Sequence, residues 1–137
     1  MLLMVGWVAT DQKANRVVPS MSTVPSTIRA QDIRVVDGDT IALGAHNIRL
    51  MGFDTPETYR AKCTFERNRG DAATKRLRNL VNGANTLDVR LTGRRDKFGR
   101  GLGGLYVDGR DVGALLIEEG LARPYHGGTR QGWCDGT

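Results

Sequence analysis

Aromatic residues are scarce in this chain of 137 residues, at 6% of the sequence. A surface that binds single-stranded nucleic acid by stacking many successive bases needs several aromatic side chains, so no extended stacking surface is expected. Only two histidines and two cysteines are present, and the cysteines, Cys63 and Cys134, lie far apart. This spacing gives no indication of a zinc site.

Long hydrophobic runs are also absent. The apolar run at residues 1–9 is far shorter than the ~20 residues that cross a bilayer as a helix, so no membrane association is expected. It resembles the core of an export signal but has no basic stretch before it. The segment that follows contains Pro19 and Pro25 and has no periodicity, as in a linker. We expect residues 1–27 to be a flexible extension or the remnant of an export signal. The protein is then secreted or periplasmic, with a cytoplasmic location as the alternative.

The two cysteines have two interpretations. Two buried free thiols are the ordinary one. In an oxidising compartment Cys63 and Cys134 can instead form a disulfide, which would close a loop of about 70 residues and stabilise the fold by roughly 4 kcal/mol. We predict the disulfide, and titration of the unreduced, unfolded protein would contradict this prediction if it found two free thiols.

The balance of charge is basic, with 20 Lys and Arg against 15 Asp and Glu and a sequence pI of about 9.7. A basic surface favours a polyanionic partner such as nucleic acid. The length is that of one domain with one core, which we place at residues 28–137 and expect to be monomeric.

Apolar residues alternate over short segments separated by glycine-rich turns, which is typical of β-strands. The predicted strands cover residues 33–35, 41–43, 48–50, 87–91 and 101–107. Helical spacing predicts a helix over residues 65–81 that stops at Gly83, and a second short helix capped by Asp111 and ending at Gly120. The order of elements predicts an α+β, mainly β fold: a five-stranded barrel of the oligonucleotide-binding type with two or three helices. Other small α+β arrangements share this pattern.

Five charged residues form a pattern that suits phosphodiester chemistry. Asp39 and Asp54 offer hard oxygen ligands for a divalent cation, and Glu57 is a candidate base. Arg49 and Arg100 offer planar guanidinium groups that bind two phosphate oxygens at once. Each residue taken alone has a simpler interpretation: a hairpin residue for Asp39, a helix entry for Glu57 and solvated charges for the arginines.

Three sequence blocks carry these residues: Val-Asp-Gly-Asp-Thr at 36–40, Arg-Leu-Met-Gly-Phe-Asp-Thr-Pro-Glu-Thr at 49–58 and Asp-Lys-Phe-Gly-Arg at 96–100. Together with Gly-Leu-Ala at 120–122, they resemble the staphylococcal nuclease (thermonuclease) family over residues 28–126. The resemblance implies an oligonucleotide-binding barrel. It also implies calcium-dependent hydrolysis of DNA and RNA with little sequence specificity, leaving 3′-phosphate ends.

The resemblance also implies roles for individual residues. Asp39, Asp54 and the carbonyl of Thr55 would bind Ca²⁺, and Glu57 would deprotonate or orient the attacking water. Arg49 and Arg100 would bind the phosphate in its transition state. Asp37 precedes Asp39 by two residues, and we expect its side chain on the opposite strand face if the chain is extended there. It is otherwise a turn former or an outer acid near the metal.

This sequence departs from the family pattern around the substrate. Phe98 stands where a tyrosine is familiar, Lys97 matches, and Tyr125 or His126 lies in a segment that replaces the tyrosine-bearing one. We expect Lys97, Phe98 and Tyr125 to contact substrate, and Trp133 with the disulfide to close the C-terminal side.

Two alternatives to a nuclease remain at this point. A nucleic-acid-binding module on the same barrel could have lost cleavage, although all five charged side chains are present. A calcium-stabilised structural domain would account for Asp39 and Asp54 but leaves Arg49 and Arg100 unexplained.

Overall fold

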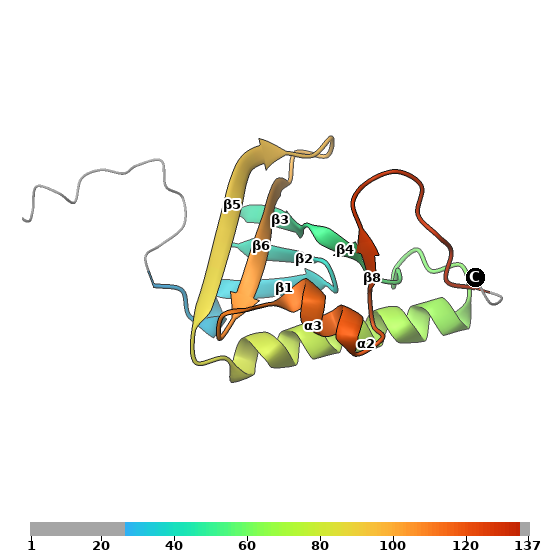
Figure 1. The fold of residues 1–137 in the computed structure, drawn as a ribbon, viewed down its shortest axis with the longest axis horizontal. Helices are drawn as coiled ribbons and strands as arrows, with labels where there is room; N and C mark the ends of the chain where they lie inside the picture. The colour runs from blue at the N-terminus through green and yellow to red at the C-terminus, as the bar shows by residue number, and fades with distance from the viewer. Residues whose placement is uncertain (1–26, 135–137) are drawn as a thin grey trace, which may run out of the picture.

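The computed structural model of the chain describes residues 27–134. The predicted N-terminal extension therefore lies outside the described residues, apart from Thr27. Runs of strands lie on both sides of the longest helix, which is in the middle of the chain (Figure 1). They are η1 Ala30–Asp32, β1 Ile33–Asp37, β2 Thr40–Leu43, β3 His46–Leu50, β4 Gly52–Asp54, α2 Thr64–Gly83, β5 Leu87–Arg95, β6 Gly101–Val107, β7 Arg110–Asp111, α3 Val112–Glu118 and β8 Arg123–Tyr125.

The main sheet has the strand order β1-β2-β3-β6-β5, with β7 paired to β6. Strands β1, β2 and β3 form the predicted antiparallel meander, in which Thr40 pairs with Arg49. Strand β6 then joins β3 in parallel and β5 antiparallel. These are the five strands that the sequence predicts, and together with two α-helices they confirm an α+β, mainly β fold of the oligonucleotide-binding type.

A second, two-stranded sheet pairs β4 with β8 and was not predicted. Gly52 lies opposite Tyr125, and Asp54 lies opposite Arg123. Strands of three residues are too short to show an alternating pattern, so the sequence gives no signal for them. The pairing brings the C-terminal segment alongside the strand that ends at Asp54.

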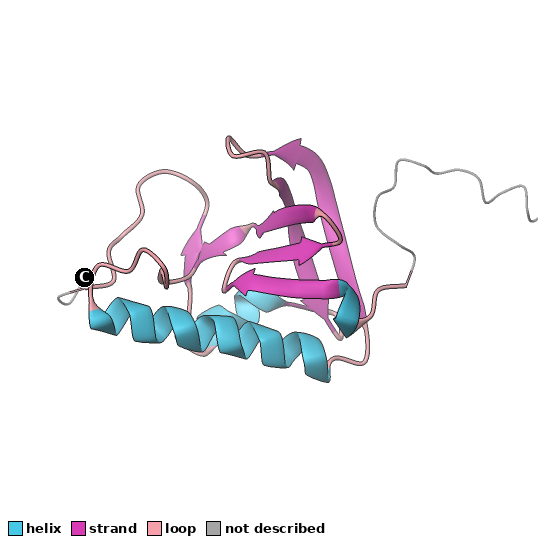
Figure 2. Ribbon diagram, turned by 180° about the vertical axis from the view of Figure 1, so that it is seen from behind, coloured by secondary structure: helices cyan, strands magenta, loops and turns pink. Residues whose placement is uncertain are grey.

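Helix α2 lies along one side of the sheet and supplies part of the core (Figures 1 and 2). Its buried apolar residues Ala73, Leu77 and Val81 recur at helical spacing and join a core that includes Leu50 and Leu105. Leu77 is fully buried, and a side chain of that size contributes about 1.5–3 kcal/mol by leaving water. The helix fixes the segment that precedes it, which carries Glu57.

Local signals at the second helix are also confirmed. The side chain of Asp111 accepts a hydrogen bond from the backbone N–H of Ala114 at 3.1 Å, as an N-cap residue does. Gly120 follows the end of α3 with a φ of +77°, the left-handed conformation that glycine adopts without strain.

The predicted disulfide is present and joins Cys63 to Cys134. It connects the N-cap position of α2 to the segment that follows β8. Trp133, beside it, packs against the guanidinium of Arg123, with 3.7 Å between the guanidinium carbon and the ring centroid. The C-terminal segment is therefore held against the start of α2.

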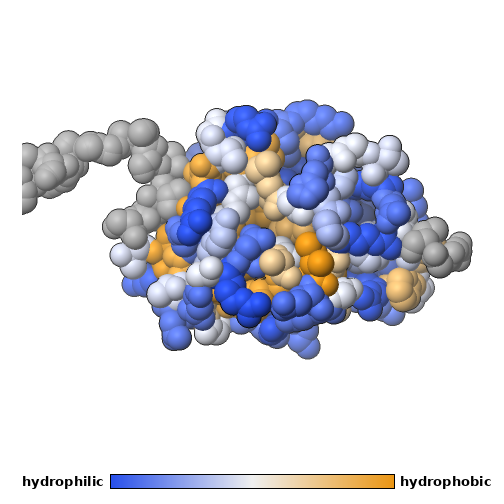
Figure 3. All heavy atoms as spheres, in the orientation of Figure 1, coloured by the Kyte–Doolittle hydropathy of each residue, from blue (hydrophilic) through white to orange (hydrophobic). Residues whose placement is uncertain are grey.

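Hydrophilic residues cover most of the face seen in Figure 3, and apolar residues form small separate areas on it. Among the described residues the exposed large apolar side chains are scattered over several elements. Within residues 27–134, none of the helices has the length and apolar character needed to span a membrane.

Candidate active site

Two aspartates face each other where the two sheets meet. Asp39 lies in the turn between β1 and β2, and Asp54 is the last residue of β4. The backbone N–H of Thr55 donates to Asp39 Oδ2 at 3.4 Å, and the hydroxyl of Thr40 donates to Asp39 Oδ1 at 3.3 Å. The turn and the end of β4 are thus linked through one carboxylate.

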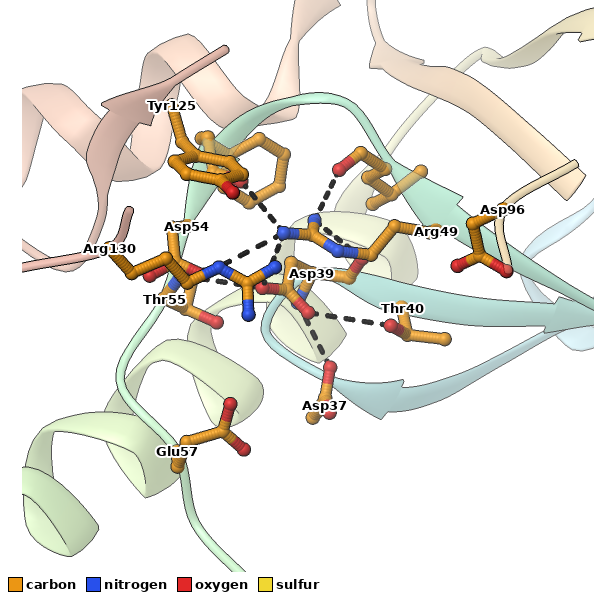
Figure 4. A network of polar contacts seen from close by, with 12 residues as sticks. Asp37, Asp39, Thr40, Arg49, Asp54, Thr55, Glu57, Asp96, Tyr125 and Arg130 are labelled. Atoms are coloured by element: carbon orange, nitrogen blue, oxygen red, sulfur yellow. Dashed lines mark hydrogen bonds and ion pairs between the residues drawn. The ribbon is translucent and has the colours of Figure 1, made fainter. Parts of the chain in front are cut away.

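Arg49 lies between these two aspartates (Figure 4). Its Nη2 is 3.4 Å from Asp39 Oδ2 and 3.6 Å from Asp54 Oδ1. The guanidinium also donates to backbone carbonyls, to Leu50 at 2.5 Å and to Phe53 at 3.3 Å. Arg49 is only 8% exposed. An arginine held by carbonyls on one side is fixed in place rather than solvated, so the simpler interpretation of it is wrong.

The position of Asp37 differs from the prediction. Side chains two residues apart in an extended strand lie on the same face, so the expected placement was wrong. The side chain of Asp37 therefore lies near Asp39, not on the opposite face, and its Oδ1 accepts a hydrogen bond from the Asp39 backbone N–H at 3.1 Å. Asp37 is a turn former and a third acid beside the pair.

Burial raises the pKa values of Asp37, Asp54 and Glu57, and the negative charge of Asp39 adds to the effect in each case. Burial, followed by repulsion from Asp39, raises the pKa of Asp37 to about 6. Burial also raises the pKa of Asp54, and repulsion from Asp39 adds to this while Arg130 and Arg49 oppose it. Burial and then Asp39 and Asp54 raise the pKa of Glu57. Several carboxylates thus share a partly buried region in which their negative charges are incompletely balanced.

These residues fit a hard divalent cation. A cation would neutralise the crowded carboxylates, and calcium accepts carboxylate and carbonyl oxygens in loose geometry. Asp39, Asp54 and Thr55 are all mostly or fully buried and lie together. A second group of potential ligands, Cys63, Glu66 and Cys134, does not fit, because both sulfurs belong to the disulfide.

Glu57 lies in the loop between β4 and α2 and faces the aspartates (Figure 4). Helix α2 begins at Thr64, so the interpretation of Glu57 as part of a helix entry is wrong. Two residues of α2 that the sequence analysis missed hold this loop. Glu66 accepts a hydrogen bond from the backbone N–H of Glu57 at 3.1 Å and another from that of Lys62 at 2.9 Å.

Gly70 is the second missed residue. A Cβ at this position would lie 2.7 Å from the carbonyl oxygens of both Pro56 and Glu57. Only glycine allows α2 to approach the loop backbone this closely. Glu66 and Gly70 together fix the backbone from which the Glu57 side chain extends.

Arg100 lies close to Thr40, at the edge of the site. Its Nε donates to Asp96 Oδ2 at 2.7 Å, and its Nη1 lies 3.4 Å from the hydroxyl of Thr40, the neighbour of Asp39. Asp96 also accepts from the backbone N–H groups of Phe98 and Arg100 and so fixes the turn. Arg100 is therefore oriented by a carboxylate and is not a solvated charge.

A cleft of about 470 Å³ connects the two predicted arginines with the predicted substrate residues. Its lining includes Arg49, Arg100, Lys97, Phe98 and Tyr125, together with His126 and Arg130. Phe98 is 72% exposed, with the ammonium of Lys97 at 5.3 Å from its ring centroid. The structure thus gathers every substrate residue predicted from the sequence into one cleft.

A second cleft, of about 560 Å³, lies next to the acids. Its lining includes Asp54, Thr55 and Glu57, with Lys62 among the basic residues. Arg130 lines both clefts, and its Nε is 3.4 Å from Asp54 Oδ1. Sequence reasoning missed Arg130, because it lies in a glycine-containing segment without periodicity.

Comparison with known proteins finds related sequences. The sequence model of a family described as "Staphylococcal nuclease homologue" matches residues 47–132. The chain is 37% identical over 119 residues to endonuclease YncB and 42% identical over 95 residues to the SPbeta prophage-derived endonuclease YokF, both of Bacillus subtilis. It is 33% identical over 95 residues to thermonuclease of Staphylococcus hyicus.

The matched regions cover 83%, 66% and 66% of this chain in these three comparisons. They cover 55% of YncB, 32% of YokF and 56% of the thermonuclease. The chain therefore spans about half or less of the length of these relatives.

Proposed function

Because the chain belongs to the family of staphylococcal nuclease homologues, we propose that it is a calcium-dependent nuclease. Its substrates are DNA and RNA, whose phosphodiester bonds it hydrolyses with little sequence specificity. The relatives include two proteins named as endonucleases and one named as a thermonuclease, which supports nuclease activity here. One observation carries the proposal most directly: the buried guanidinium of Arg49 lies within 3.6 Å of both Asp39 and Asp54.

In this arrangement the guanidinium of Arg49, which can bind phosphate, lies directly beside Asp39 and Asp54, which can bind a metal ion. Asp39, Asp54 and the Thr55 carbonyl would hold Ca²⁺, which supplies positive charge to a phosphate oxygen and to the attacking water. Arg49 and Arg100 bind the non-bridging oxygens of the phosphate, whose negative charge increases as a fifth oxygen approaches phosphorus. Both guanidinium groups line the same cleft and are already oriented.

Glu57 acts on the water. Its carboxylate extends from a loop that Glu66 and Gly70 hold in place, and it deprotonates or orients the water that attacks phosphorus. The bond between phosphorus and the 5′ oxygen then breaks, and the departing oxygen takes up a proton with the help of Arg100. This sequence leaves a 3′-phosphate on one product and a 5′-hydroxyl on the other.

We further propose that the protein works as a monomer outside the cytoplasm. The disulfide between Cys63 and Cys134 supports an oxidising compartment. A catalytically silent nucleic-acid-binding module is the second candidate function. It is less favoured, because Arg49, Glu57 and Arg100 all retain side chains that face or line the site.

Degradation of DNA and RNA by the purified chain tests the proposal. We expect release of short products in Ca²⁺, none with a chelator, and 3′-phosphate ends detected by phosphatase treatment. Asp39→Asn should require more Ca²⁺ for half-maximal activity, whereas Asp71→Asn on the exposed face of α2 should leave the requirement unchanged. Degradation that persists in chelator would exclude the calcium-dependent mechanism.

A further inference from the structure

Arg130 occupies the boundary between the two clefts. It contributes to the lining of the cleft that holds Arg49 and Arg100 and to that of the cleft that holds Glu57. Its side chain is 48% exposed, so it is accessible to a ligand from solvent. A strand of nucleic acid that passes from one cleft to the other would have to pass Arg130.

The guanidinium of Arg130 is only partly engaged within the described residues. Nε lies 3.4 Å from Asp54 Oδ1, an oxygen that Arg49 also approaches at 3.6 Å. The guanidinium carbon lies 4.9 Å from the ring centroid of Tyr125. Figure 4 shows the Arg130 guanidinium beside Asp54. Asp54 is therefore already paired with the buried guanidinium of Arg49, whereas the side chain of Arg130 is half-exposed.

The loop that carries Arg130 is held at several points. The hydroxyl of Tyr125 donates to the carbonyl of Gly128 at 2.7 Å. Arg123 donates to the carbonyl of Gly132 at 2.8 Å and packs against Trp133. The disulfide from Cys134 then ties the end of the loop to α2. Because these contacts lie on both sides of Arg130, the loop presents its guanidinium at a defined place between the clefts.

The charges of the second cleft favour an anionic ligand at its rim. Arg60, Lys62 and Arg130 all contribute to its lining, and Arg60 and Lys62 are exposed. Of its acids, Asp54 and Glu66 are buried, whereas Glu57 is exposed. A polyanion along this rim would meet the basic groups, with the buried Asp54 and Glu66 beneath it and Glu57 as the one exposed acid of the lining.

We propose that Arg130 is a third phosphate-binding arginine, which contacts a phosphate next to the scissile one in a single strand and guides that strand from the first cleft into the second. The inference rests on the proposed function, since it takes nucleic acid as the ligand. Arg130 is then a specificity-determining residue that favours substrates extending past the cleaved bond. Its contact with Asp54 holds the guanidinium at the boundary until a phosphate is bound.

The salt dependence of binding tests this without any cleavage. Binding of a fluorescent single-stranded DNA is measured by anisotropy in chelator over a series of salt concentrations. Each lost phosphate contact reduces the slope of log K against log [salt] by about 0.7 for a single strand. Arg130→Gln should reduce the slope by that amount and weaken binding, whereas Arg130→Lys should keep the slope.

Arg78→Gln is the matched control, because Arg78 is exposed on α2 and lines none of the clefts described. It should leave the slope unchanged. An unchanged slope for Arg130→Gln, with a reduced slope for Arg49→Gln, would overturn the role of Arg130 and leave the proposed function in place. Wild-type protein that does not bind the DNA at any salt concentration would overturn both.

Discussion

Glu66 is predicted to determine both the stability of the protein and the position of Glu57. Its side chain accepts hydrogen bonds from the backbone N–H groups of Glu57, at 3.1 Å, and Lys62, at 2.9 Å, and the residue is 6% exposed. A hydrogen bond to a charged group contributes about 1.5–3 kcal/mol to the free energy of unfolding. Glu66→Ala removes both bonds, but water from the adjoining cleft can replace part of them. We expect a loss of about 3 kcal/mol.

Glu66→Gln separates the two bonds. The amide oxygen of the glutamine can accept one of the two backbone N–H groups, and its NH₂ group can accept none. The loss should therefore be about half that of Glu66→Ala, roughly 1.5 kcal/mol. Glu118→Gln serves as the matched control, since Glu118 pairs with Arg110 on the exposed surface and such a pair contributes about 0–1 kcal/mol.

Urea unfolding of the three variants measures the change in their free energy of unfolding. The rate at which each folded variant cleaves single-stranded DNA shows whether Glu57 is still correctly positioned. Both Glu66 variants should cleave more slowly than the wild type, because the loop that carries Glu57 loses its attachment to α2. A Glu66→Ala variant within about 0.5 kcal/mol of the wild type, the range of ordinary surface substitutions, would refute this reasoning.

Three further predictions concern other parts of the site. Gly70→Ala should cost about 1–3 kcal/mol by forcing α2 away from the loop backbone; a melting temperature equal to that of the wild type would contradict the close approach. Replacing Cys63 and Cys134 together by alanine should lower the free energy of unfolding by about 4 kcal/mol in the chain-entropy account. Urea unfolding measures this loss, and adding reductant to the wild type should reproduce it. Arg100→Lys should reduce kcat by well over ~10-fold with KM much less changed; steady-state kinetics that show an unchanged kcat would remove Arg100 from the mechanism.

The sequence predicts those features of the site and the fold that depend on short local patterns of residues. The turn at Asp37 and Gly38 places Asp39 between two strands, and the cap at Asp111 and the stop at Gly120 mark the second helix. These features depend on a few neighbouring residues, so they can be predicted without knowledge of the tertiary structure.

Features that depend on contacts between distant segments were missed. Glu66 has the appearance of an ordinary solvated residue on a charged helix, yet the helix turns it toward the loop of Glu57. Gly70 is a small residue within a helix, and its role is visible only once α2 lies against Pro56. Arg130 comes near Asp54 only through the pairing of β4 with β8 and the disulfide.

Paired binding and cleavage measurements on Glu57→Gln test the central claim most directly. The wild type and the variant are given the same single-stranded DNA in Ca²⁺, with Glu118→Gln as the control. We predict that both bind it with similar affinity, while cleavage by Glu57→Gln falls by about 10²-fold or more, as expected for loss of a general base. Wild-type protein that binds the DNA and leaves it intact at every Ca²⁺ concentration would contradict the account and make the chain a binding module.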